Sequence, residues 1–410
     1  MTRGTRPASP LRVQLWTYNY DPEPTGIGPV STTLARELRA RGHDVAVVAA
    51  HPHYPEPVWG RRVAPYREIR NGVRVLRLPL RIGRATAGER MRQEASYALA
   101  LTAALPFLGR PEVVVAASPS FPALLPTLLG AEARRIPWVL WLHDILPEGA
   151  AATGLLEEGS VLRASRLLER TAYRSAARIV VLSRAFATNL AEKGVAPAKV
   201  ELIYDPATRV PSATPSPPTG TAPPRLLSMG NIGFSQGLAP LVAAFEADER
   251  MAQLGARLVI TGNGVAAEEV RREVRSARVE MLGLVSDAAL EDELRRANVA
   301  LVTQHHRGAE FNIPSKLMNF MAYGLPVLAA VNPASEVAHI VSSSEGGWVV
   351  DSSRPATLPD AVAALATDPH DVTRRGAAAL AHAREHFEVE RFGELFEDVL
   401  LGVVGQREQG

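Results

Sequence analysis

Short apolar runs alternate with amphipathic stretches along the first half of the chain. Each run is rich in β-branched residues, which is typical of a strand buried on both faces. The predicted strands are residues 13–17, 45–49, 73–78, 113–117, 138–142, 179–182 and 200–204. Because helical segments separate these strands, the pattern indicates a parallel sheet covered by helices.

The stretch after the first strand predicts a helix whose N-terminus lies next to that strand. Leu34, Ala35 and Leu38 share one face at helical spacing. We expect Ser31 to cap the start of this helix and Gly42 to end it in a left-handed conformation.

The pattern breaks after Asp205, where a stretch rich in proline, serine and threonine is too stiff and polar for a core element. A second series of strands follows, at residues 226–229, 258–261, 279–282, 299–303, 327–330 and 348–350. The repeated alternation predicts an α/β fold of two doubly wound Rossmann-like domains that face a central cleft, with the ligand at the carboxyl ends of the strands.

The same pattern sets the expected domain boundaries. The N-terminal domain covers residues 11–205, a linker covers 206–224, and the C-terminal domain covers 225–385. We expect residues 386–410 to form a C-terminal helix that packs back toward the N-terminal domain, and residues 1–10 to be disordered.

Composition narrows the class of protein. The 410 residues include no cysteine, which excludes disulfides, thiolate metal sites and a cysteine nucleophile. The net charge of +2, from 45 basic and 43 acidic residues, is not that of a nucleic-acid-binding protein. No signal peptide and no run of 18 apolar residues is found. We therefore expect a cytoplasmic protein that does not span a membrane.

Glycine-rich turns follow the first predicted strand of each half. Gly26 and Gly28 lie in the first half, and Gly230, Gly233 and Gly237 in the second. Free backbone N–H groups before a helix can bind an anion such as a diphosphate. The alternative is that these glycines only permit tight turns.

Gly262 and Gly264 begin a Gly-x-Gly-x-x-Ala sequence that has the form of a dinucleotide fingerprint. That fingerprint requires the first strand of a domain and an acidic residue at the end of the next strand. Here the next strand ends at Gly283. A dehydrogenase is therefore a disfavoured alternative.

Lys316 lies in the first turn of a predicted helix that Ser315 is expected to cap. A cation there opposes the helix dipole and costs a few tenths of a kcal/mol unless it faces an anion. Lys316 is thus a candidate ligand of a diphosphate, with a solvent-facing lysine as the alternative. His305 and His306 precede it, but neighbouring side chains at a strand exit point to opposite sides, so we expect no metal site.

His143 and Asp144 directly follow the predicted strand 138–142. Polar groups at the carboxyl ends of such strands act on ligands in α/β proteins, which makes both residues catalytic candidates. The alternative is that Asp144 caps a helix with His143 packed beneath it.

These motifs, in this order, resemble the retaining family 4 glycosyltransferases of the GT-B fold, especially the bacterial branch of colanic-acid and other surface-polysaccharide transferases. The resemblance covers nearly the whole chain. It rests on TGIG at 25–28, LHDILPE at 142–148, VLSRAFATNLAEKGV at 181–195, GNIGFSQGL at 230–238, IPSKLMNFMAYGLPVLA at 313–329 and Ser335-Glu336.

The resemblance implies transfer of a sugar, such as an N-acetylamino sugar, from a nucleotide diphosphate donor of the UDP type to an acceptor hydroxyl, with retention and without a metal or cofactor. The acceptor is a glycan, a lipid-linked or a small molecule. The implied catalytic residues are His143, Asp144, Lys316 and Glu310. The expected donor-binding residues are Gly26, Gly28, Gly230, Asn231, Gly233, Gln236, Gly237, Gly262, Gly264, Leu284, Val285, Phe311, Asn312, Ile313, Pro314, Ser315, Asn319 and Glu336.

Two positions depart from the family pattern. Asn319 stands where a second glutamate normally meets the ribose, and Gln236 stands where a phosphate-binding lysine is common. Lys316 is therefore the clearest positive group for a diphosphate. Two alternatives stay open: a sugar-nucleotide epimerase on the same fold, and a catalytically silent GT-B partner protein.

Residues 81–108 combine arginines with an apolar tail from Tyr97 to Leu108. This composition suits peripheral contact with an anionic bilayer on the inner face of the cell membrane. The alternative is a helix whose apolar residues pack inward while its arginines stay in water.

Overall fold

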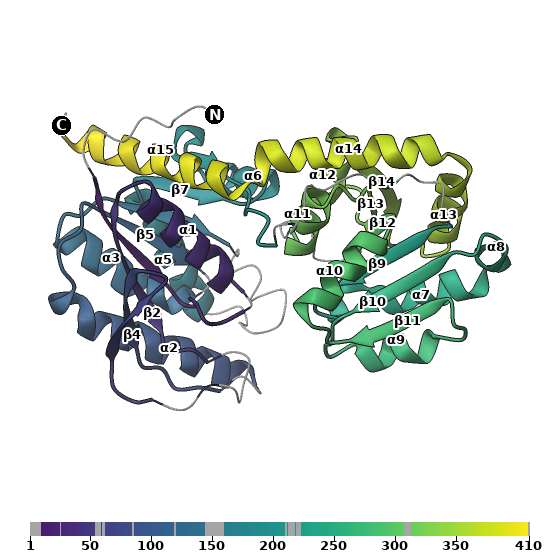
Figure 1. The fold of residues 1–410 in the computed structure, drawn as a ribbon. Helices are drawn as coiled ribbons and strands as arrows, with labels where there is room; N and C mark the ends of the chain where they lie inside the picture. The colour runs from purple at the N-terminus through teal and green to yellow at the C-terminus, as the bar shows by residue number, and fades with distance from the viewer. Residues whose placement is uncertain are drawn as a thin grey trace. The chain divides into compact units, whose positions relative to one another are not determined.

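A computed structural model describes residues 10–24, 26–53, 59, 62–83, 86–118, 120–143, 160–209, 211, 218, 223–306 and 313–408. The chain divides into two compact units, one of residues 1–204 with 389–410 and one of residues 205–388. Each unit is built on one sheet (Figure 1). This confirms the predicted α/β class with two Rossmann-like domains.

The first unit contains an eight-stranded sheet in the order β3-β4-β2-β1-β5-β6-β7-β8. Its strands are β1 Arg12–Thr17, β2 Asp44–Ala50, β3 Tyr66–Arg70, β4 Val73–Leu78, β5 Val113–Ser118, β6 Trp138–Leu142, β7 Arg178–Val181 and β8 Val200–Leu202. Its helices are α1 Gly28–Ala40, α2 Ala87–Ala104, η1 Leu105–Phe107, η2 Phe121–Ala123, α3 Leu124–Ala133, α5 Ser160–Ser175, α6 Arg184–Glu192, η3 Pro197–Lys199 and α15 Val389–Glu408.

All neighbouring strands of this sheet are parallel except β3 and β4. The prediction missed β3 because its residues alternate between exposed and half-buried positions and form no apolar run. An edge strand with one solvated face reads as polar.

Helices α1 and α15 cover one face of the first sheet. Phe392, Phe396 and Leu400 of α15 join a core cluster with α1 and the sheet, and the rings of Phe392 and Phe396 contact Trp141. The last helix of the chain therefore completes the core of the unit that begins it.

The second unit contains a six-stranded, fully parallel sheet in the order β11-β10-β9-β12-β13-β14. Its strands are β9 Arg225–Met229, β10 Arg257–Thr261, β11 Val279–Gly283, β12 Val299–Thr303, β13 Val327–Val331 and β14 Gly347–Asp351. Its helices are η4 Phe234–Gln236, α7 Leu238–Ala247, α8 Glu249–Gln253, α9 Ala267–Glu273, α10 Asp287–Arg296, α11 Ser315–Ala322, α12 Glu336–Ser343, α13 Thr357–Thr367 and α14 Pro369–His386.

Strand order reverses direction at β9 in this sheet, since β10 and β12 flank it on opposite sides. Such a switch point opens a crevice at the carboxyl ends of the strands. The loops that follow β9, β10 and β12 are therefore the first place to look for a site in the second unit.

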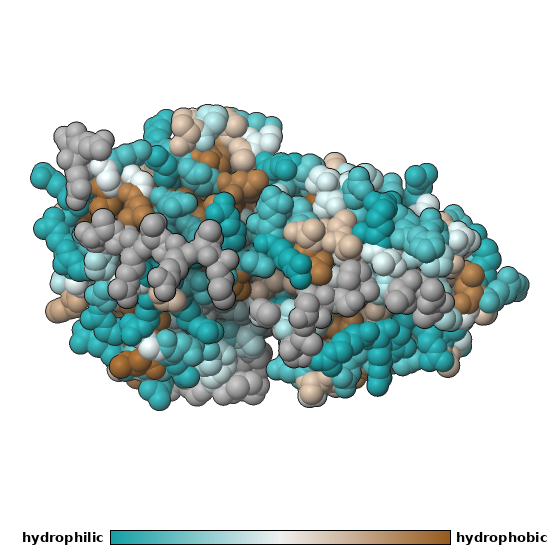
Figure 2. Space-filling model, turned by 45° about the horizontal axis from the view of Figure 1, so that its top comes forward, coloured by the Kyte–Doolittle hydropathy of each residue, from teal (hydrophilic) through white to brown (hydrophobic). Residues whose placement is uncertain are grey.

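The apolar tail of residues 81–108 is buried only in part: Tyr97, Ala98, Leu101 and Leu108 are buried, whereas Leu99 and Phe107 are 72% and 77% exposed. Among the described residues, no helix is both long enough and apolar enough to cross a membrane. In the view of Figure 2, hydrophilic residues cover most of each unit's visible face, and apolar residues form separate patches.

Candidate functional site

Three loops meet at the carboxyl ends of β9, β10 and β12 in the second unit. The amide of Gly230 donates to the carbonyl of Thr261 at 3.0 Å, and the amide of Ile232 donates to Asn263 at 2.9 Å. The amide of His305 donates to the carbonyl of Ser235 at 2.8 Å. The glycine-rich turn is therefore fixed in place by its neighbours.

Glycine is required at two positions of this turn by backbone conformation. Gly230 has a φ of 100° and Gly237 a φ of 59°, in the left-handed region that favours glycine. Gly237 ends η4 and directly precedes α7, whose N-terminal N–H groups lie beside the turn. This is the arrangement in which a helix N-terminus can bind an anion.

Lys316 lies in the first turn of α11, as predicted. Its ammonium donates to Oε1 of Gln236 at 2.8 Å, the one hydrogen-bond partner that the described residues provide. Burial lowers the pKa of Lys316 to about 8. The solvent-facing alternative is therefore wrong, and the structure brings together two of the predicted donor-site residues.

Gln236 owes its position to η4, which packs against the end of β12. A Cβ added to the next residue, Gly237, would lie 3.3 Å from the Cα of His305. Because this contact and the 2.8 Å bond of the His305 amide hold η4, the amide of Gln236 is held in turn against Lys316.

Gly262 and Gly264 are explained by close backbone packing. A Cβ on Gly262 would lie 1.9 Å from the carbonyl oxygen of Gly230, and one on Gly264 would lie 2.4 Å from that of Ile232. Both glycines let the loop after β10 approach the loop after β9. These glycines are required for packing between two loops of the protein, and not for the close approach of a dinucleotide.

Exposed apolar side chains gather at one corner of the second unit. Phe234, Val265 and Leu284 are 65%, 77% and 82% exposed, and they follow the neighbouring strands β9, β10 and β11. Leu284 was expected to meet a base, and half-buried Val285 follows it. Sequence reasoning missed Phe234 and Val265, although an apolar residue inside a glycine-rich turn was a usable signal.

Helix α11 differs from expectation at its start. Pro314 is its N-cap and no side chain caps it, so the predicted cap Ser315 is wrong. Buried Asn319 accepts a hydrogen bond from the backbone amide of Arg209 at 3.0 Å. Its carboxamide oxygen therefore ties down the segment that enters the unit.

Glu336 lies in the first turn of α12, directly after the cap residue Ser335, and is buried. Ile313 and Pro314 are half-buried before α11, and Asn231 is exposed after Gly230. The predicted residues Glu310, Phe311 and Asn312 lie outside the described residues.

In the first unit, Gly26 lies in the loop between β1 and α1, and Gly28 is the first residue of α1. Gly26 has a φ of 64°, and a Cβ on Gly28 would lie 2.8 Å from the carbonyl oxygen of Glu23. Helix α1 begins at Gly28 with a proline in its first turn, so the predicted cap Ser31 is wrong. The hydroxyl of Ser31 instead hydrogen-bonds that of Thr17 at 3.1 Å.

His143 directly follows β6, as predicted, and its ring lies edge-on to Trp141 with centroids 4.6 Å apart. Burial lowers the pKa of His143 to about 3. The imidazole is therefore neutral near pH 7 and can act through hydrogen bonds and not as a cation. Asp144 lies outside the described residues.

A polar cluster that sequence reasoning missed lies at the ends of β1 and β2. Buried Glu23 accepts from the amide of His53 at 3.0 Å and lies 3.2 Å from Nδ1 of the same ring. Asn19 donates to the other carboxylate oxygen at 3.1 Å, and Tyr18 packs edge-on against His53. The polar residues that directly follow the apolar runs of β1 and β2 were the sequence signal from which this cluster could have been predicted.

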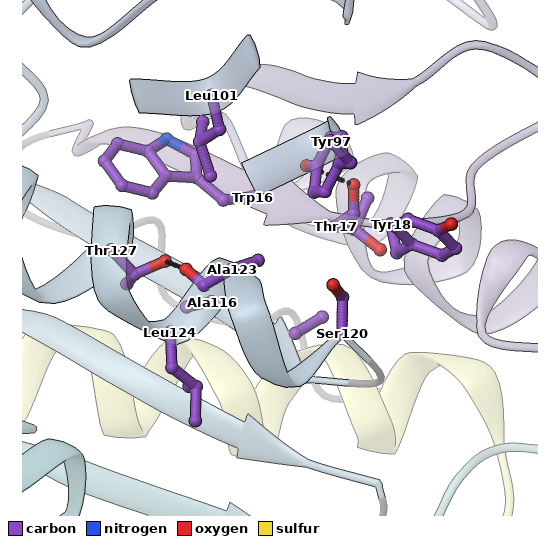
Figure 3. A pocket seen from close by; sticks show the side chains of 11 residues that line it. Trp16, Thr17, Tyr18, Tyr97, Leu101, Ala116, Ser120, Ala123, Leu124 and Thr127 are labelled. Atoms are coloured by element: carbon purple, nitrogen blue, oxygen red, sulfur yellow. Dashed lines mark hydrogen bonds between the residues drawn. The ribbon is translucent and has the colours of Figure 1, made fainter. Parts of the chain in front are cut away.

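A small enclosed cavity of about 10 Å³ adjoins Tyr18, between α2, α3 and the ends of β1 and β5 (Figure 3). The hydroxyl of Ser120 is buried beside it and finds no hydrogen-bond partner among the residues that the structure describes. The volume suits one water molecule.

His305 and His306 stack with ring centroids 4.4 Å apart, so the expectation that they point to opposite sides is wrong. Among the described residues, no group of three histidine, aspartate or glutamate side chains is placed to hold a metal ion.

Two family models match the chain, one in each half. Residues 25–206 match the glycosyl transferase 4-like domain, and residues 223–368 match glycosyl transferases group 1.

Two curated proteins are similar in sequence. The chain is 25% identical over 361 residues to the putative colanic acid biosynthesis glycosyl transferase WcaI of Escherichia coli, a match that covers 82% of this chain and 87% of that protein. It is 27% identical over 235 residues to the probable glycosyltransferase WbjE of Pseudomonas aeruginosa, covering 54% of this chain and 58% of that relative.

Solved structures share the fold. Anabaena HepE in complex with UDP matches with a TM-score of 0.68 and 14% identity, over 96% of this chain and all of that one. Sucrose-phosphate synthase of Thermosynechococcus elongatus matches with a TM-score of 0.70 and 17% identity, over 96% and 99%. With the two family models on its two Rossmann-like units, the chain belongs to the family 4 glycosyltransferases of the GT-B fold.

Proposed function

We propose that this glycosyltransferase moves a hexosyl or N-acetylaminohexosyl group from a UDP-sugar to an acceptor hydroxyl in surface-polysaccharide synthesis, with retention and without a metal. The observation that carries the proposal is the ammonium of half-buried Lys316, held by Gln236 beside the glycine turn and the start of α7. A cation partly withdrawn from water beside a helix N-terminus suits the diphosphate of such a donor.

The reaction breaks the bond between the anomeric carbon and a phosphate oxygen, and it forms a bond from that carbon to the acceptor oxygen. Negative charge grows on the leaving diphosphate, and the acceptor proton passes to one of its oxygens. Lys316 and the amides at the start of α7 stabilise that growing charge. The neutral ring of His143 accepts or donates a hydrogen bond to the sugar or the acceptor.

The exposed side chains of Phe234, Val265 and Leu284 offer an apolar surface against which a flat, apolar group can pack at the same edge of the unit. Aromatic and aliphatic side chains bind the faces of heterocyclic bases by packing. The nucleotide base of the donor fits this description. The titles of the HepE structures, which name UDP and UDP-glucose as its ligands, support a nucleotide-sugar donor.

Donor binding tests the proposal. UDP-, GDP-, ADP- and dTDP-glucose are added without metal to wild type and to Lys316→Ala, and thermal unfolding is followed. A ligand at 100 times its dissociation constant stabilises the folded state by about 2.7 kcal/mol. We expect the UDP-sugar to raise the melting temperature of the wild type, and Lys316→Ala to lose this shift.

Product analysis separates the alternatives. A new glycoside with unchanged anomeric configuration supports the transferase. Conversion of the donor sugar without acceptor would instead support an epimerase, and absence of any shift with every nucleotide sugar would support a silent partner protein.

A further inference from the structure

One helical layer of the first unit carries large apolar side chains on its outer side. Helix α3 contacts both α2 and α5 (Figure 1). The outward residues are Leu99, Phe107, Leu125, Leu129 and Leu167, which are 51% to 77% exposed. A single exposed leucine needs no explanation, but several on one layer indicate an interaction surface.

The inner side of this layer is already packed. Leu101 of α2 and Leu124 of α3 line the same small cavity as Trp16 of the sheet (Figure 3). Helices α1 and α15 pack in a core cluster that contains none of these residues. On α3, Leu124 and Leu128 are buried while their neighbours Leu125 and Leu129 are exposed. Rotating the helix to bury Leu125 and Leu129 would therefore expose Leu124 and Leu128, which lie about 100° away around it.

Helix α5 adds a stripe of positive charge to the same surface. Its exposed residues include Arg163, Arg166, Leu167, Arg170 and Arg174. At about 100° per residue these five positions fall within an arc of about 100° on one side of the helix. The stripe therefore faces one way along about three turns, with Leu167 in its middle.

Within α5 itself, no exposed acidic residue neutralises this stripe. Glu169 is the one acidic residue in the sequence of α5. It is buried, where it accepts hydrogen bonds from the hydroxyl of Tyr173 at 2.6 Å and from Lys193 at 2.9 Å. On the other side of α3, exposed Arg92 of α2 lies seven residues before Leu99 and so on the same face.

We propose that the outer surface of the α2–α3–α5 layer, defined by its exposed leucines, Phe107 and the arginine stripe, docks on an anionic phospholipid bilayer. Leucines flanked by arginines suit the interface, where apolar side chains enter the acyl boundary and guanidinium groups pair with acidic headgroups. From the apolar run Tyr97 to Leu108 the surface takes the exposed side chains Leu99 and Phe107, while Tyr97, Ala98, Leu101 and Leu108 are buried. The surface is independent of the donor site, so its test does not require transfer activity.

Vesicle flotation tests the proposal. Full-length protein is mixed with vesicles of phosphatidylcholine, or of phosphatidylcholine with phosphatidylglycerol, at low and high salt. We expect binding to the anionic vesicles only, and weaker binding at high salt. Each arginine near such a surface contributes about a fivefold gain in binding, so Arg166→Gln with Arg170→Gln should bind about 25-fold more weakly. The double variant Leu125→Ser with Leu129→Ser should also bind more weakly. This loss of binding should depend less on salt than the loss in the arginine variant.

Matched controls lie on the second unit. Arg271→Gln with Arg272→Gln on α9 removes two exposed arginines, and Val265→Ser removes one exposed apolar side chain. Both controls should bind vesicles like wild type. Equal binding to both kinds of vesicle, no binding to either, or unchanged binding of the layer variants would each overturn the proposal. The melting temperature of every variant shows whether it is folded.

Discussion

The contact between Lys316 and Gln236 predicts how donor binding depends on pH. With a pKa of about 8, Lys316 is mostly charged at pH 7 and mostly neutral at pH 9. A diphosphate binds the charged form, so binding takes up a proton above pH 8. We expect the dissociation constant of UDP-glucose to be level below pH 7 and to rise about tenfold between pH 7 and pH 9, which is about 1.4 kcal/mol.

Replacing Gln236 by methionine should move this dependence to lower pH. A hydrogen bond to a charged group contributes about 1.5–3 kcal/mol, and the 2.8 Å contact favours the ammonium over the neutral amine. Its loss should lower the pKa of Lys316 by about one to two units. At pH 8 the variant should therefore bind UDP-glucose about tenfold more weakly than wild type.

Isothermal titration calorimetry from pH 6 to pH 9, in buffers of different ionisation enthalpy, measures both the affinity and the proton uptake. Lys199→Met is a matched control, because burial also lowers the pKa of Lys199 but its ammonium donates to the carbonyl of Tyr173 in the first unit. The reasoning is refuted if Gln236→Met keeps the wild-type pH profile, or if Lys199→Met shifts it.

Three further predictions concern stability. Gly262→Ala should destabilise the second unit by roughly 3 kcal/mol or more, because the new Cβ would overlap the carbonyl of Gly230. Gly283 has a φ of 68° and open space around it, so Gly283→Ala should cost only about 1–2 kcal/mol. Urea unfolding measures the stability of both variants. Asn319→Ala should cost about 1–3 kcal/mol through the lost bond to the linker amide yet leave UDP-glucose affinity unchanged; a large loss of affinity with unaltered stability would contradict this. Burial raises the pKa of Asp205 to about 7, so the folded state holds a proton that the unfolded state releases above about pH 4. The free energy of unfolding should therefore fall by at most about 4 kcal/mol as pH rises from 4 to 7. Asp205→Asn should abolish this pH dependence in thermal unfolding.

The sequence predicted those elements best that are buried on both faces. The predicted strand 299–303 coincides with β12, whose five residues are all buried. A fully parallel sheet between helices produces such continuous apolar runs. Strand β3 escaped prediction because it lies at the sheet edge, where one face is in water and its pairing partner is not visible in the sequence.

Helix starts were predicted less well than helices. Ser31 and Ser315 are good capping residue types, but each lies inside its helix, at or after its first residue. Local propensity is similar over neighbouring positions, so tertiary contacts decide the start. At Ser31 that contact is the hydroxyl of Thr17, which is distant in sequence.

In the candidate site, the sequence pointed to Lys316 because the helix dipole makes a lysine in a first turn unfavourable without an anion. It could not point to the pairing with Gln236, 80 residues away, since only the fold brings η4 to α11. The same holds for Asn319, whose partner is a backbone amide that carries no sequence signal.

The path of the chain through the first unit has a consequence for its synthesis. The second unit is one continuous segment, residues 205–388, whereas the first unit is complete only with α15. On the ribosome the second unit therefore has all of its residues before the first unit does, although it is made later. The first unit must wait for Phe392 and Phe396 to cover Trp141, and until then it exposes apolar surface that can aggregate.

A chain that stops at residue 388 should accordingly contain a folded second unit and a first unit that proteases degrade. Limited proteolysis of that truncated chain, with and without α15 supplied as a separate peptide, measures this order of assembly. If the first unit of the truncated chain resisted proteolysis as well as that of the full-length protein, α15 would not be needed for its fold.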